Sequence, residues 1–112
     1  MARTELTVQT ISRAGLEATY GSAIADGHKF PNDGRMTFVH IKNGLVDKTI
    51  TIQTAATVDG KAVGDDAITC TANEERLIGP FPASIYNQAD GMVYIDYSSP
   101  TNVTVAVLRL GF

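Results

Sequence analysis

The sequence predicts an all-β protein, an antiparallel β-sandwich of jelly-roll type with seven or eight short strands and an irregular N-terminal region. Two observations support this prediction. Thr, Val and Ile make up 31 of the 112 residues, and a branched Cβ favours a pleated strand over a helix. Between Arg35 and Leu110, short runs of alternating apolar and polar residues are separated by turn residues at the spacing of about 8–12 residues that β-sandwiches show.

The strand pattern is clearest in five runs, each of which alternates with a period of two. These runs are RMTFVHIK (35–42), TITIQT (49–54), AITCT (67–71), MVYIDY (92–97) and NVTVAVLRL (102–110). The first and last runs carry apolar residues on both faces, so we expect both faces to be covered. Asn-Gly or Asp-Gly pairs at residues 43–44, 59–60 and 90–91 predict turns. The five residues 98–102 are expected to join the last two strands as a hairpin.

The N-terminal region differs from the rest of the chain. We expect residues 1–34 to form a strand or arm and an irregular loop that pack on a sandwich body of residues 35–112, within a single domain. The run ELTVQT predicts a first strand with Leu6 and Val8 on one face. The glycines that follow argue against a regular helix. This long connection is either a packed loop or a functional arm.

Charge and hydropathy exclude several classes of partner. The net charge is −3, the isoelectric point is near 5.2, and the basic residues are scattered, so we expect no nucleic-acid partner. The N-terminus lacks the apolar core of a secretory signal, and no apolar run is long enough to span a membrane. We therefore expect a protein made in the cytoplasm that does not bind membranes.

Few residues suggest chemistry. The lone Cys70 alternates with Ile68 and is expected to be a small buried apolar side chain. His40 is expected to be partly buried and hydrogen-bonded, whereas His28 is expected in a solvated loop. The two histidines have no Cys or His partner at ligand spacing, so neither a metal nor another cofactor is expected. Serine-nucleophile, phosphate-loop and dinucleotide motifs are also missing, so we expect neither an enzyme nor a small-molecule substrate.

Aromatic residues gather in two stretches outside the clear strands, from Tyr20 to Phe30-Pro31 and from Phe81-Pro82 to Tyr86. They either fold back over the ends of the sandwich or form an exposed contact patch. Arg109, within an apolar strand, is either a solvent-reaching side chain or part of an ion pair or subunit contact. The candidate protein-contact residues are Leu6, Val8, Tyr20, Phe30, Pro31, Phe81, Pro82, Tyr86 and Arg109.

The order of motifs resembles that of small proteins encoded among the head genes of tailed bacteriophages. The motifs are Asp26-Gly27-His28 with FPNDGR, Lys42-Asn43-Gly44, TITIQT, RLIGPFP, YNQADGMVYIDYSS and the terminal VTVAVLRL. In this order the chain resembles capsid decoration (cementing) proteins, or closely related minor virion proteins, from about Leu6 to Leu110. The most specific part runs from Gly79-Pro80-Phe81-Pro82 into a paired C-terminal hairpin.

This resemblance implies a non-enzymatic structural virion protein that binds the outer surface of a phage capsid and stabilises the expanded shell. The implied partners are the major capsid protein and further copies of the chain, as a trimer or dimer. Two alternatives stay open. The chain could be another virion component, such as a head–tail connector or a tail or fibre-associated protein, or it could be a carbohydrate-binding β-sandwich module.

Overall fold

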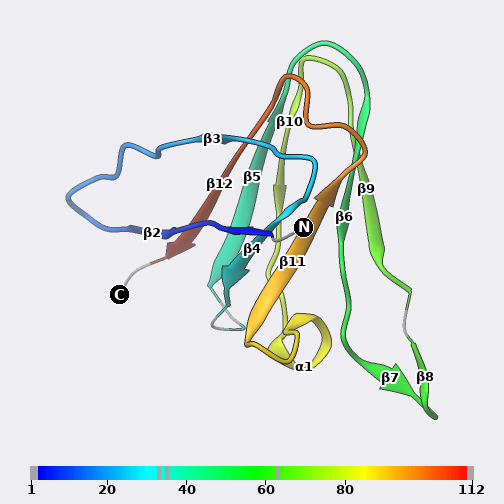
Figure 1. Ribbon diagram of the computed structural model, residues 1–112. Coiled ribbons are helices and arrows are strands. Elements are labelled where there is room, and N and C mark those ends of the chain that lie inside the picture. Colours follow the sequence, from blue (N-terminus) through cyan, green and yellow to red (C-terminus); the bar gives the residue numbers. More distant parts are fainter. Residues whose placement is uncertain (1–2, 33, 35, 63, 111–112) are drawn as a thin grey trace.

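The computed structural model describes residues 3–32, 34, 36–62 and 64–110, and within them two mixed five-stranded sheets pack face to face as a β-sandwich (Figure 1). The first sheet has the strand order β1-β4-β11-β6-β9. Its strands are β1 (Thr4–Glu5), β4 (His28–Pro31), β11 (Met92–Tyr97), β6 (Lys48–Ile52) and β9 (Asp66–Cys70).

The second sheet has the order β10-β5-β12-β2, and the short strand β3 also pairs with β12. Its strands are β10 (Glu75–Ile78), β5 (Thr37–Asn43), β12 (Val103–Leu110), β2 (Val8–Ile11) and β3 (Gly21–Ser22). The remaining elements are the hairpin β7 (Thr57–Val58) and β8 (Lys61–Ala62) and the single-turn helix α1 (Ala83–Tyr86). Among the described residues, no helix is long and apolar enough to cross a membrane.

The core lies between the sheets and follows the alternation read from the sequence. Every second side chain of β5 and β6 is buried, including Val39, Ile41, Ile50 and Ile52. The strand β12 lies between β5 and β2, and its residues 103 and 105–108 are buried, as the apolar character of both its faces predicted. Cys70 is also fully buried, and burial raises the pKa of its thiol.

The sandwich is not purely antiparallel, which corrects the expected architecture. The strand β1 pairs in parallel with β4, and β2 pairs in parallel with β12. Alternation reports which face a residue occupies but not the direction of the neighbouring strand, so the sequence pattern could not reveal this. The described residues also form more than eight strands, because two-residue strands such as β1 and β3 show no alternation.

The predicted C-terminal hairpin is wrong. The strand β11 pairs with β4 and β6 in the first sheet, whereas β12 pairs with β5, β2 and β3 in the second. The loop of residues 98–102 therefore crosses from one sheet to the other. By contrast, the Asp59-Gly60 hairpin is confirmed, and the positive φ angles of 52° and 77° at these residues are those of a type I′ turn.

The N-terminal third of the chain contributes strands to both sheets. Residues 1–34 supply β1 and β4 to the first sheet and β2 and β3 to the second. The Gly-rich connection contains no helix, as expected. Arg35 and Val63, at the ends of two expected strand or hairpin segments, lie outside the described residues.

Candidate contact surfaces

The outer face of the second sheet carries an apolar groove at the end where β5 begins and β10 ends. The groove has a volume of about 280 Å³. Its lining residues are Met36, Thr37, Phe38, Leu77, Ile78, Gly79, Pro80 and Leu110. Leu77 and Leu110 are 67% and 48% exposed. Two large aliphatic side chains are thus presented to solvent beside an open hollow, as at protein contact sites.

Close packing of the backbone shapes the floor of this groove. Gly79 follows β10 directly and has a φ of 149°, and a Cβ atom there would lie 2.8 Å from the Cβ atom of Phe38. Only a glycine lets the chain pass so close to β5. The strand β10 pairs with β5 alone, so it is an edge strand, as the two prolines that follow it predicted.

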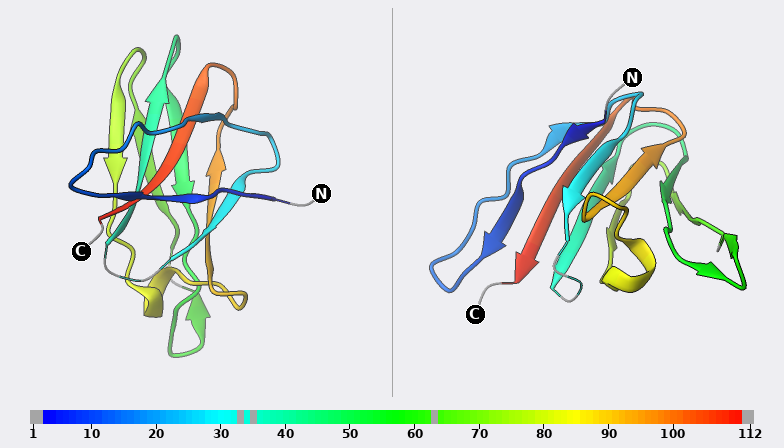
Figure 2. Two further views of the ribbon diagram at one scale, coloured as in Figure 1. Left: turned by 90° about the vertical axis from the view of Figure 1, so that its left-hand side faces the viewer. Right: turned by 60° about the horizontal axis from the view of Figure 1, so that its bottom comes forward.

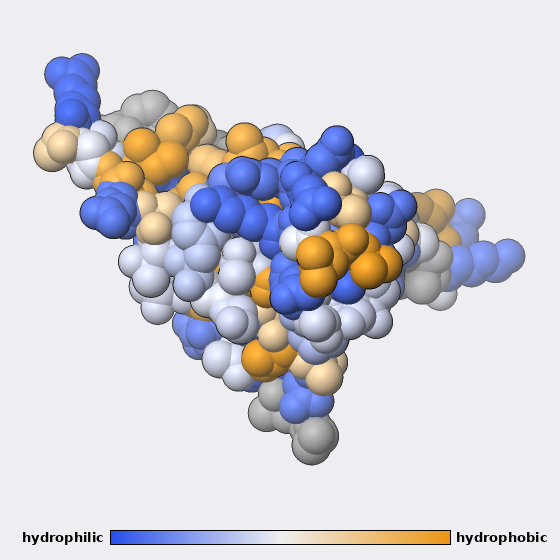
Figure 3. Space-filling view, turned by 90° about the horizontal axis from the view of Figure 1, so that it is seen from above, coloured by the Kyte–Doolittle hydropathy of each residue, from blue (hydrophilic) through white to orange (hydrophobic). Residues whose placement is uncertain are grey.

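A second apolar surface lies at the opposite end of the sandwich, where three loops meet. Leu45 and Val46 at the tip of the β5–β6 loop are 69% and 61% exposed. Figure 3 looks onto this end and shows apolar residues surrounded by hydrophilic ones. We call this surface the apex.

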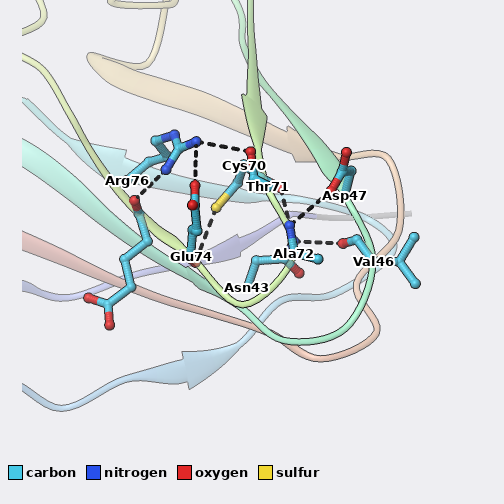
Figure 4. Close-up of polar contacts among 9 residues, drawn as sticks. Asn43, Val46, Asp47, Cys70, Thr71, Ala72, Glu74 and Arg76 are labelled. Carbon is cyan, nitrogen blue, oxygen red and sulfur yellow. Dashed lines mark hydrogen bonds and ion pairs between the residues drawn. The ribbon is translucent and has the colours of Figure 1, made fainter.

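Backbone hydrogen bonds lock the apex loops together. The Gly44 amide donates to the Asn102 carbonyl over 2.9 Å, and the Asn73 amide donates to the Gly44 carbonyl over 2.7 Å. The Asn43 side-chain amide donates to the carbonyl oxygens of Val46 and Cys70 over 2.6 and 2.9 Å (Figure 4). The two exposed aliphatic residues are therefore held on a braced loop, so a partner would not have to order that loop on binding.

Charged side chains complete this bracing. Asp47 accepts a hydrogen bond from the Ala72 amide over 2.9 Å. The Arg76 guanidinium donates to Thr71 Oγ1 over 3.2 Å and to Glu74 Oε1 over 3.0 Å (Figure 4). These contacts satisfy the polar groups of the β9–β10 turn and leave the apolar side chains of the apex facing solvent.

The arrangement that most resembles a catalytic relay is a chain of three side chains on the outside of the second sheet. The Tyr20 hydroxyl lies 2.6 Å from His40 Nδ1, and His40 Nε2 lies 2.7 Å from Glu75 Oε1. Lys42 Nζ lies 4.0 Å above the Tyr20 ring. These contacts fasten Tyr20 onto the sheet, and they confirm that His40 is partly buried and hydrogen-bonded.

His28 is not in a solvated loop, which corrects the sequence prediction. It begins β4 and is buried, with Nδ1 2.7 Å from the Tyr97 hydroxyl. Burial lowers the pKa of His28 and raises that of Tyr97. The Asp-Gly-His motif suggested a turn, but the alternation of His28 with Phe30 on the buried face was the signal that the sequence contained. Among the described residues, no group of three or more His, Cys, Asp or Glu could hold a metal ion.

The candidate aromatic residues form an internal cluster at the groove end of the sandwich. Phe30 and Phe81 are buried, with ring centroids 5.7 Å apart, and Tyr86 meets Phe81 edge-on at 5.4 Å. The Tyr86 hydroxyl hydrogen-bonds to Asp66, and this bond raises the tyrosine pKa to about 12. Of the two alternatives, these three aromatics fold back over the core.

The other candidate residues do not gather in one patch. Leu6 and Val8 are partly buried against the core, on the N-terminal side of the sandwich. Pro31 and Pro82 are exposed beside the aromatic cluster. Arg109 is exposed and donates to Thr10 Oγ1 over 3.3 Å. The exposed residues of the groove and the apex were thus not among the sequence candidates.

Comparison of the chain with family models, with curated proteins and with solved structures finds no match.

Proposed function

We propose that this protein is a non-enzymatic structural component of a phage virion that binds the outer surface of the capsid and stabilises the expanded shell. The observation that carries this proposal is the pair of exposed apolar surfaces, the groove and the apex, at opposite ends of one braced sandwich. The resemblance of the motif order to capsid decoration proteins supplies the identity of the partner, the major capsid protein.

The geometry supports a bridging role. A body with one contact surface at each end can touch two capsid subunits across their junction. A standard interface buries about 800 Å² per partner, so each copy would add such an area at a place where internal DNA pressure separates subunits. Many copies with modest affinity act together. Binding only the expanded shell would stabilise that shell by mass action.

The contribution of the groove to such binding follows from its exposure. Complete burial of a leucine side chain stabilises by about 1.5–3 kcal/mol. Leu77 is 67% exposed, so burying its remaining surface in an interface is worth about 1–2 kcal/mol per copy. A Leu77→Asp variant loses this term and places a carboxylate in the interface, so its affinity for capsids should fall by about tenfold or more.

The test is co-sedimentation of the purified protein with expanded heads of the phage that encodes it, followed by a density map of the decorated particle. We expect binding over the whole shell, and weaker binding by Leu77→Asp. Val58→Asp is the matched control, because Val58 is 65% exposed on the separate β7–β8 hairpin. Density at a single vertex would instead indicate a connector. Failure to bind heads, together with binding to immobilised glycans, would indicate a carbohydrate-binding module.

A further inference from the structure

The N-terminal segment, residues 3–11, lies along the edges of both sheets. Its strand β1 adds in parallel to β4, and β2 adds in parallel to β12. Between the two strands the Leu6 amide donates to the Lys29 carbonyl over 2.8 Å. The segment therefore changes sheets within a few residues, and it covers the edges of β4 and β12 on this side of the sandwich.

The surface beneath the segment recognises it by charge and by shape. Arg3 Nη1 donates to Asp96 Oδ1 over 2.6 Å and to the Ile95 carbonyl over 3.1 Å. The guanidinium also lies 4.7 Å from the centre of the Tyr94 ring. Leu6 and Val8 pack against the buried core. A complementary seat for this stretch of polypeptide is thus present on the molecule.

The segment nevertheless rests on the body without filling the space around it. A hollow of about 310 Å³ lies on one flank, lined by residues that include Leu6, Gln9, Thr19 and Ala106. A second hollow, of about 280 Å³, is lined by residues that include Val8, Asn32 and Arg109. Because voids forfeit packing contacts, the segment is held less firmly than a strand inside the core.

The connection that follows the segment is suited to opening. Residues 12–17 are all exposed, and the loop between β2 and β3 extends away from the sandwich in Figures 1 and 2. A turn at Gly15, whose amide donates to the Ser12 carbonyl, and two hydrogen bonds between the Gln9 side chain and the Thr19 backbone hold it closed. Extended, the nine residues 12–20 reach roughly 30 Å, close to the 36 Å middle dimension of the molecule.

We propose that residues 3–11 are exchanged between copies of this chain, so that the segment of one copy occupies the β4 and β12 edges of another. Every contact between the segment and its seat is remade in the exchanged form, and only the turn at Gly15 is lost. Exchange of an identical element in this way is a low-cost route to an oligomer. The inference does not depend on the proposed function, since it concerns two copies of the chain alone.

A disulfide across the segment and its seat tests the exchange. Thr10 and Arg109 are register partners of β2 and β12, and both are exposed. The double variant Thr10→Cys, Arg109→Cys removes only surface side chains, and neighbouring strands bring the two Cα atoms within disulfide range. Isotope-labelled and unlabelled chains are mixed in urea, refolded together at high protein concentration, oxidised and digested. We expect linked peptides that combine one labelled and one unlabelled chain, and covalent oligomers on a non-reducing gel.

A control pair within the body calibrates this experiment. Thr49 and Thr69 are register partners of β6 and β9, so Thr49→Cys, Thr69→Cys should give linked peptides of a single isotope. If the Thr10–Arg109 pair also gives only single-isotope peptides and monomeric protein, the segment stays in its own chain and the proposal is wrong. The Thr10→Cys variant alone measures linkage that arises from random collision.

Discussion

The buried His28 should make the stability of this protein depend on pH. Its ring is enclosed between the sheets and faces the Tyr97 hydroxyl, which can donate to the neutral imidazole. Burial lowers the pKa of His28, so below pH of about 6.5, the ordinary histidine pKa, the unfolded chain binds more protons than the folded chain. The stability that His28 contributes is therefore present above that pH and is lost as the pH falls towards the folded pKa.

The size of this effect follows from linkage. Between the two pKa values, one proton changes the free energy of unfolding by about 1.4 kcal/mol per pH unit. From pH 7.5 to pH 5.5 the wild-type protein should therefore lose up to about 1.4 kcal/mol through this residue. The variant His28→Gln keeps a polar partner for the Tyr97 hydroxyl but cannot titrate, so it should lose less stability over the same interval.

Urea unfolding at pH 7.5, 6.5 and 5.5 measures this difference. Tyrosine fluorescence suits the assay, since the chain has four tyrosines and no tryptophan. Other titrating groups are common to both proteins, so the difference between the two pH profiles isolates His28. Identical profiles for wild type and His28→Gln would refute the reasoning. So would an NMR titration in which folded His28 takes up its proton at pH 6.5 or above.

Three further substitutions have expected outcomes. Gly79→Ala should lower the free energy of unfolding by more than about 1 kcal/mol, because the new Cβ would meet Phe38, whereas Gly64→Ala, which meets no atom within 4 Å, should change it by less than about 0.5 kcal/mol. Burial alone would raise the pKa of Asp96, but the Arg3 and Gln53 hydrogen bonds lower it; stability from this group is present above pH of about 3.9 and lost below, so Asp96→Asn should flatten acid unfolding followed by circular dichroism. Ile41→Ala in the core should cost about 2–5 kcal/mol in urea unfolding.

The strands that the sequence predicts well are those with one fully buried face. In β5 and β6 the alternation of apolar and polar residues matches the observed burial residue by residue. The apolar character of both faces of residues 103–110 likewise indicated that β12 is central. In each case burial itself selects the side chain, so the pattern is written locally.

Pairing and direction were not recoverable, because they depend on residues far apart in the chain. The five residues 98–102 could close a hairpin or cross between sheets with equal ease, and the fold uses the crossing. Strands of two residues, such as β1, carry no period at all. His28 was misplaced because its preceding glycine was given more weight than its alternation with Phe30.

The contact surfaces were missed for a related reason. Leu45 and Val46 directly follow the Asn-Gly turn, and two large aliphatic residues at a turn are a signal that the sequence did contain. Leu77 alternates normally within its strand, so only the position of β10 at the sheet edge exposes it. The aromatic residues attracted the prediction instead, and the largest of them were needed for the core.

The two open sides of the sandwich are protected in different ways, and this difference indicates how a partner can bind. On one side the N-terminal segment covers the edges of β4 and β12. On the other side β9 begins with Asp66, and the four-residue β10 carries Glu75 and Arg76 before it reaches Pro80. Charges, short length and proline all discourage the addition of a foreign strand. A partner at the groove therefore meets the side chains of Leu77 and its neighbours, so side-chain substitutions there should govern its affinity.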